Sequence, residues 1–188
     1  MPALTAVALG IALGLACGGT LGQLSQAKLR FEAALILMFL VQAFARGRLP
    51  FVSSGSAYAL PIWVFASCAC VAILLLNMRV PGMAIAAAGL LLNLDAVLLN
   101  GAMPALVPAR AADASASKAL SFGAGFYQGV NPATHLPWLG DVLSISVRGA
   151  TYLLSAGDVA LAIGVLSVIV WAMSREARGP QQPSLGIV

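Results

Sequence analysis

Five apolar segments recur along the chain and are separated by polar stretches. A helix rises about 1.5 Å per residue, so about 20 apolar residues cross the hydrocarbon core of a bilayer. The pattern therefore predicts an all-α integral membrane helix bundle of about five transmembrane helices, with one long outer loop at residues 101–150. The second segment is short, and it fits a tilted span, a re-entrant segment or a span extended through Lys28 and Arg30. The five segments cover residues 3–22, 31–45, 58–77, 82–100 and 152–173.

Composition supports a membrane protein. Of the 188 residues, 61% are hydrophobic and 9% are charged, and the mean hydropathy is +0.97. Soluble domains carry about 25% charged residues, and a soluble core of this length could not bury so much apolar surface. We therefore expect the lipid bilayer as the main partner, with residues 1–174 forming one transmembrane domain. Residues 175–188 are expected to form a short cytoplasmic tail.

The ten lysines and arginines are scattered in ones and twos between the apolar segments. They form no basic patch interleaved with aromatic residues, so the net charge of +4 does not suggest a nucleic-acid partner. Basic residues in short loops favour the cytoplasmic side of a membrane. We therefore predict an external N-terminus and a cytoplasmic C-terminus. In this orientation, five of the basic residues in short loops lie inside and two lie outside. The five are Lys28, Arg30, Arg79, Arg175 and Arg178, and the two are Arg46 and Arg48.

Small residues mark one face of two segments. In the first segment, glycines recur every fourth residue, and the missing Cβ atoms let another helix approach closely. We predict that this face packs within the chain, with a dimer seam as the alternative. In the fourth segment, a small-residue face ends in two amides, which also predicts helix packing. The first set is Gly10, Gly14, Gly18 and Gly22, and the second is Gly82, Ala86, Gly89, Asn93 and Asn100.

Two carboxylates lie inside apolar segments, where a charge is costly unless it faces protein or water. Asp95 is five residues from the outer end of its segment, and Asp158 is about six residues inside the last one. Both therefore lie about 7 to 10 Å below the outer surface. We predict an outward-facing polar pocket with Asp158 and Ser155 on its inner wall. Its other expected members are Asp95, Asn100 and the outer-loop residues His135 and Asp141.

Three short motifs occur around the long outer loop. They are NGAMP (100–104), LGD (139–141) and SAGD (155–158). In these motifs the chain resembles an uncharacterised bacterial membrane family, domain-of-unknown-function family 5317, over nearly its whole length. The resemblance implies a small polytopic protein of the bacterial cytoplasmic (inner) membrane. It implies no established reaction and therefore no catalytic residues.

Two functions from different classes fit these residues. The first is a non-catalytic membrane protein that binds a ligand or ion in the outward-facing pocket, or serves as a subunit of a larger membrane complex. The alternative is an intramembrane hydrolase in which Asp95 and Asp158 divide the acid and base roles, and it needs their carboxylates about 3 Å apart. With one histidine and no HExxH motif, no metal site is predicted. The cofactor, the chemistry of the ligand and the oligomeric state stay open.

Overall fold

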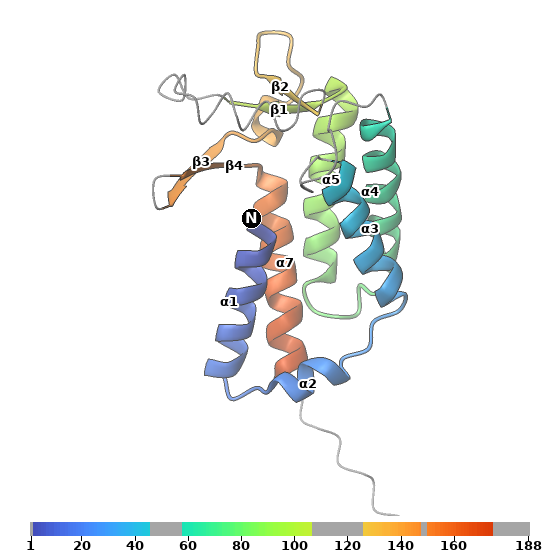
Figure 1. Cartoon of the computed structure of the whole chain (residues 1–188), viewed down its shortest axis with the longest axis vertical. Coiled ribbons are helices and arrows are strands. Elements are labelled where there is room, and N and C mark those ends of the chain that lie inside the picture. The colour runs from blue at the N-terminus through green and yellow to red at the C-terminus, as the bar shows by residue number, and fades with distance from the viewer. Residues whose placement is uncertain (1, 46–57, 107–125, 148–149, 175–188) are drawn as a thin grey trace, which may run out of the picture.

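The computed structural model describes residues 2–45, 58–106, 126–147 and 150–174 (Figure 1). This part of the chain is mostly helical, with six α-helices, as the apolar pattern predicts. Three of these helices are long and apolar enough to cross a membrane. They are α4 (Ala59–Leu76), α5 (Met83–Asn100) and α7 (Ala156–Met173).

Two further apolar helices are shorter, so five full-length spans are not confirmed. Helix α1 (Pro2–Ala16) has 15 residues and α3 (Glu32–Ala45) has 14. The chain leaves α1 well before residue 22 because Gly18 adopts a φ of +82°, a conformation that ends helices. The N–H of Gly19 then donates to the carbonyl of Gly14 at 2.9 Å. A short helix, α2 (Leu21–Gln26), starts directly afterwards.

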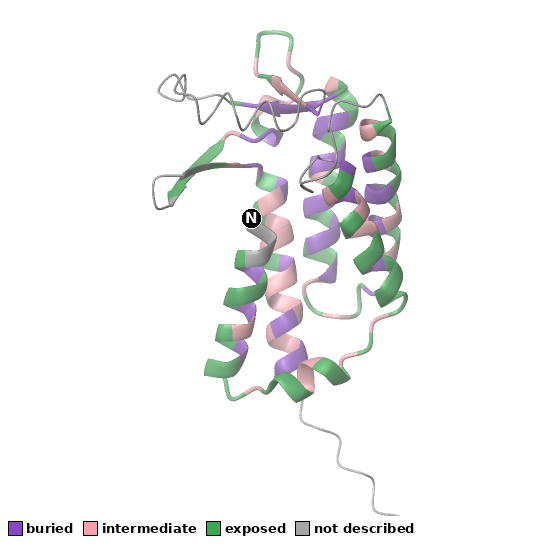
Figure 2. Ribbon diagram, in the orientation of Figure 1, coloured by how far each residue is buried: buried purple, intermediate pink, exposed green. Residues whose placement is uncertain are grey.

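The three long helices and the two shorter ones pack as a row of neighbours in the order α3, α4, α5, α7, α1. Residues of α3, α4 and α5 form one buried hydrophobic core, which includes Leu35, Cys70 and Leu90. Figure 2 shows that burial is concentrated where helices face each other, while the outward faces are exposed. Many of the exposed side chains are large and apolar, such as Ile36 and Phe65. Such a surface fits a lipid environment.

Helices α5 and α7 approach each other closely at their glycines. A Cβ atom added at Gly89 of α5 would lie 2.5 Å from the carbonyl oxygen of Gly157 and 2.5 Å from the amide nitrogen of Leu161. A Cβ atom added at Gly164 of α7 would lie 2.5 Å from the amide nitrogen of Ala86. Only residues without a side chain fit these positions, because real Cβ atoms do not approach backbone atoms so closely. The small-residue face predicted for the fourth segment is therefore a packing face.

Helix α1 packs on the other side of α7. An added Cβ atom at Gly10 would lie 3.1 Å from Cβ of Ile169, and one at Gly14 would lie 3.1 Å from Cβ of Met173. The structure thus places these two glycines against α7. It places Gly18 and Gly22 beyond the end of α1, where an added Cβ atom at Gly18 would meet nothing within 4 Å. The packing face of α1 is accordingly shorter than the glycine spacing suggests.

The predicted helix bundle carries short strands at one end, the end where α5 finishes. Two small sheets and the 3₁₀ helix η2 (Pro137–Leu139) lie there (Figure 1). In the first sheet, β1 (Met103–Ala105) pairs in parallel with β2 (Tyr127–Gly129). In the second, β3 (Leu143–Val147) forms an antiparallel pair with β4 (Ala150–Leu154). We call this end of the bundle, with its strands and η2, the loop layer.

The last apolar segment is therefore not helical from residue 152. Its first residues belong to β4, and α7 starts only at Ala156. The sequence of β3 alternates apolar and polar residues, which is the pattern of a strand rather than of a membrane helix. Thr151 and Tyr152 are of types that favour strands. These local preferences prevail because the segment also pairs with β3.

The loop layer is anchored to the helices by aromatic packing. Phe126 is 1% exposed, and its ring meets that of Trp63 of α4 edge-to-face at 5.2 Å. Met103 and Leu139 belong to the same buried cluster. Trp138, in contrast, is 63% exposed, which suits a residue at a membrane–water interface. Phe126, Met103 and Leu139 therefore fix the described part of the loop layer to the bundle.

The contact between α5 and α7 predicts that leucine substitutions at two adjacent residues of α5 have different effects on stability. Gly89→Leu forces a side chain into the backbone of α7, and we expect a loss of about 2–3 kcal/mol in the free energy of unfolding. Ala88→Leu is the matched control because Ala88 is exposed, and it should change that free energy by less than about 0.5 kcal/mol. Unfolding of the two purified variants in detergent measures both. Equal losses in the two variants would contradict the close packing of α5 on α7.

Candidate ligand-binding site

Asp158 lies in the first turn of α7, directly after the strand β4. Ser155 is the N-cap of this helix, and its Oγ accepts a hydrogen bond from the amide of Asp158 at 2.9 Å. Such a cap satisfies one of the amides that have no partner within the helix. The unpaired amides of a helix N-terminus also stabilise a nearby negative charge. Asp158 is therefore nearer to a helix end, and better placed for a charge, than the predicted depth of about six residues implies.

Asn93 of α5 joins both of these residues. Its Nδ2 donates to Oδ1 of Asp158 at 2.9 Å, and its Oδ1 accepts from Oγ of Ser155 at 2.6 Å. Asn93 is 1% exposed and Ser155 is fully buried. Together with the capping bond, the contacts close a ring of three hydrogen bonds between α5 and α7. This arrangement needs Gly157 between the capping residue and the carboxylate, because a side chain there would collide with the amide of Asn93.

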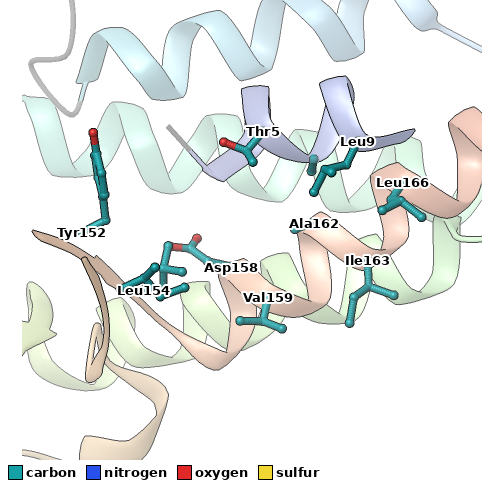
Figure 3. Close-up of a pocket in the computed structure, with 11 residues that line it drawn as sticks. Thr5, Leu9, Tyr152, Leu154, Asp158, Val159, Ala162, Ile163 and Leu166 are labelled. Atoms are coloured by element: carbon teal, nitrogen blue, oxygen red, sulfur yellow. The ribbon is translucent and has the colours of Figure 1, made fainter. Parts of the chain in front are cut away.

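The carboxylate of Asp158 borders a cavity of about 470 Å³ between α1, α7 and the β3–β4 hairpin (Figure 3). Asp158 is the only charged residue among the eleven described residues that line this cavity. Thr5 of α1 and Tyr152 of β4 are the polar uncharged residues of the lining, and the hydroxyl of Tyr152 points away from the carboxylate of Asp158 (Figure 3). The remaining wall is apolar. It consists of Ala6, Leu9, Ile145, Leu154, Val159, Ala162, Ile163 and Leu166.

The cavity is thus polar at one end and apolar along its length. Asp158 and Leu166 are eight positions apart on α7, which corresponds to about 12 Å along the helix. Since an apolar cavity with a single carboxylate has few groups to satisfy a polar ligand, the lining suits an elongated apolar molecule with one cationic or hydrogen-bond-donating end.

The structure places the other predicted pocket residues of the outer loop in a different contact. Asn100, the last residue of α5, accepts from the amide of His135 at 2.8 Å and donates to the carbonyl of His135 at 3.0 Å. It also donates to the carbonyl of Ala96 at 2.8 Å. The side chain of Asn100 therefore acts as a clamp on the backbone at His135 in the loop layer. Neither Asn100 nor His135 is among the described residues that line the cavity.

Asp141 belongs to the loop layer as well. It is 6% exposed, its amide donates to the carbonyl of Pro104 at 2.7 Å, and its carbonyl accepts from the amide of Leu106 at 3.1 Å. Gly140 lies directly against the backbone of Pro104. The motifs NGAMP and LGD are therefore brought together by backbone contacts, while SAGD supplies the cap, the close glycine and the carboxylate of the candidate site.

Asp95 lies on the opposite face of α5 from Asn93. Two helical positions correspond to a rotation of about 200°, so when Asn93 faces α7, Asp95 must face away from it. Asp95 is accordingly exposed, and it does not line the cavity. The structure brings Asp158 together with Asn93 rather than with Asp95, and it offers no support for a carboxylate dyad.

Sequence reasoning missed three residues of the site. Asn93 was expected to lie on a packing face, but not to form a hydrogen bond with the carboxylate of Asp158. Its position two residues before Asp95 places it close to the depth that was predicted for both carboxylates. Tyr152 was assigned to a helix, so its position across the cavity could not be anticipated. Thr5 lies on a helix whose partner the sequence does not identify. Among the described residues, no group of three histidine, cysteine or acidic side chains could hold a metal ion.

A family model matches residues 26–170 of the chain. The chain belongs to the family of unknown function DUF5317. This finding agrees with the resemblance carried by the three motifs. No curated protein and no solved structure matches the chain. The DUF5317 match includes Asn93, Ser155 and Asp158, whereas α1, which forms one wall of the cavity, precedes it.

Proposed function

We propose that this DUF5317 protein is a non-catalytic multi-pass membrane protein that binds a cationic amphiphile in the cavity beside Asp158. The observation that carries the proposal is the single carboxylate at one end of an otherwise apolar cavity. Asp158 offers a negative charge to the ligand's head group, and the side chains along α7 and α1 offer a surface for its apolar tail. The exposed apolar faces of the helices support a bilayer as the surroundings from which such a ligand enters.

Binding fits the site better than catalysis because the polar partners of the carboxylate already have structural roles. The hydroxyl of Ser155 caps α7 and donates to Asn93, and the amide of Asn93 bridges the two helices. A nucleophile needs a base within hydrogen-bond reach, and Ser155 has an amide oxygen there instead. The carboxylate oxygens of Asp158 thus act as acceptors for a ligand rather than as reactants.

The proposal predicts a dependence on the charge of the ligand and of residue 158. Dodecylamine, added to the full chain in a neutral detergent, should raise the unfolding temperature, since a ligand that binds the folded state stabilises it. Dodecanol and dodecanoate have the same tail and should have a much smaller effect. Asp158→Asn keeps an acceptor for Asn93 but removes the charge, and we expect affinity for the amine to fall about tenfold, which corresponds to about 1.4 kcal/mol.

The matched control is Asp95→Asn, which removes a carboxylate outside the cavity. This variant should bind dodecylamine like the unaltered protein. Equal affinity of Asp158→Asn and the unaltered protein would disprove the proposed site. Stabilisation by potassium or sodium ions alone, without any effect of the amine, would instead indicate an ion site and would also contradict an amphiphile ligand.

We further propose a bacterial inner-membrane location with the N-terminus outside and the C-terminus in the cytoplasm. The arrangement of basic residues supports this orientation. Asn77, after α4, accepts from the amide of Arg30 at 2.8 Å and donates to its carbonyl at 3.0 Å. This clamp brings Lys28 and Arg30 to the same end of the bundle as Arg79, at the far end of α5 from Asn100. Basic clusters of this kind favour the cytoplasmic side.

The orientation predicts the behaviour of reporter fusions. A reporter that works only in the cytoplasm should be active when it is fused after Arg178. A reporter that works only outside the cytoplasm should be inactive at the same position and active when it is fused before the N-terminus. The reverse pattern would contradict the orientation and would place the cavity beside Asp158 on the cytoplasmic side.

A further inference from the structure

Asp95 is a carboxylate on a lipid-type surface. It lies on the exposed face of α5 among apolar side chains, with Leu91 39% exposed one turn before it and Leu98 58% and Leu99 51% exposed after it. Ile85 continues the same exposed face at 44%. The opposite side of the helix is used for packing on α4 and α7. Asp95 thus interrupts a surface that is otherwise suited to hydrocarbon.

The depth of Asp95 makes this position costly. It lies five residues before Asn100, which is about 7.5 Å along the helix, and Asn100 bonds to the loop layer. Asp95 is therefore between one and two turns below that layer. Aspartate has a short side chain and, unlike lysine or arginine, cannot reach far along a helix to an aqueous interface. Ionisable residues inside membranes are usually paired or face water.

We propose that the Asp95 face of α5, defined by Ile85, Leu91, Asp95, Leu98 and Leu99, binds a transmembrane helix of another membrane protein that carries a lysine or arginine at the depth of Asp95. The complementary charge would pair with the carboxylate, and the exposed leucines would pack against the apolar side chains of the partner. This surface lies on a different face of α5 from the contact with α7 and the bridge to Asp158.

The helices that the structure describes in a second copy of the chain carry no basic side chain that could pair with Asp95. All ten lysines and arginines lie outside the helices that the structure describes, and those helices contain no histidine. A symmetric dimer through this face would also use the same patch on both copies, and it would bring one Asp95 close to the other. Like charges at short distance disfavour each other's ionised form. The charge pattern therefore favours a different protein as the partner.

A defined peptide tests the interaction. The full chain is reconstituted in phosphatidylcholine vesicles with a labelled transmembrane peptide of about 22 leucine and alanine residues, which carries one lysine at the matching depth. Energy transfer between label pairs measures association. We expect the lysine peptide to associate about tenfold more strongly than a peptide with leucine at that position, as for polar contacts between model membrane helices.

Variants of the chain locate the contact. Asp95→Asn should reduce association of the lysine peptide to the level of the leucine peptide, and Asp95→Glu should retain it. Asp158→Asn is the control and should leave association of the lysine peptide unchanged. A failure of the proposed helix contact is therefore distinguishable from a failure of the proposed amphiphile site. Equal association of the two peptides, or no effect of Asp95→Asn, would overturn the proposal. Energy transfer between two labelled copies of the chain that is lost in Asp95→Asn would also overturn it, because it would show self-association through this face.

Discussion

The close approach of α5 and α7 at Gly89 and Gly157 is the constraint on which the rest of the structure depends. Two helices normally keep their side chains between them, but here the carbonyl oxygen of Gly157 lies only 2.5 Å from the position that a Cβ atom at residue 89 would take. At that separation, the short side chain of Asn93 reaches both Ser155 and Asp158. In a membrane, where little drives helices together beyond packing and polar contacts, small residues next to a buried amide form an effective interface.

The contact between α5 and α7 also determines the directions in which the carboxylates of Asp158 and Asp95 point. The bond to Asn93 holds one oxygen of Asp158 against α5, and the residue borders the cavity between α1, α7 and the β3–β4 hairpin. Because Asn93 faces α7, Asp95 faces outward from the bundle. Two carboxylates at similar depth are thereby assigned to separate surfaces. One suits a small amphiphile within the chain, and the other suits a neighbouring helix.

The sequence was informative where a single helix face carried the signal. The helical character and the packing face of α5 could be predicted, because each depends on residues that are close in the sequence. Ser155 was expected on the wall of a pocket beside Asp158, but it is fully buried as the N-cap of α7 and is not among the described residues that line the cavity. The β3–β4 hairpin could not be predicted. The alternation in β3 is typical of a strand, but the apolar residues of β4 fit a membrane segment equally well. The placement of Asn100 and His135 apart from Asp158 depends on contacts between distant segments, which spacing alone does not reveal.

The most direct test of this account is a double-mutant cycle between Asn93 and Asp158. Asn93→Leu, Asp158→Leu and the double variant would be unfolded in detergent, and the coupling free energy calculated from the differences. A direct hydrogen bond between the two side chains predicts a coupling of about 0.6 to 2 kcal/mol, with the double variant losing less stability than the sum of the single variants. Additive losses, within about 0.3 kcal/mol, would contradict the bridge between α5 and α7 and with it the position of the carboxylate at the cavity.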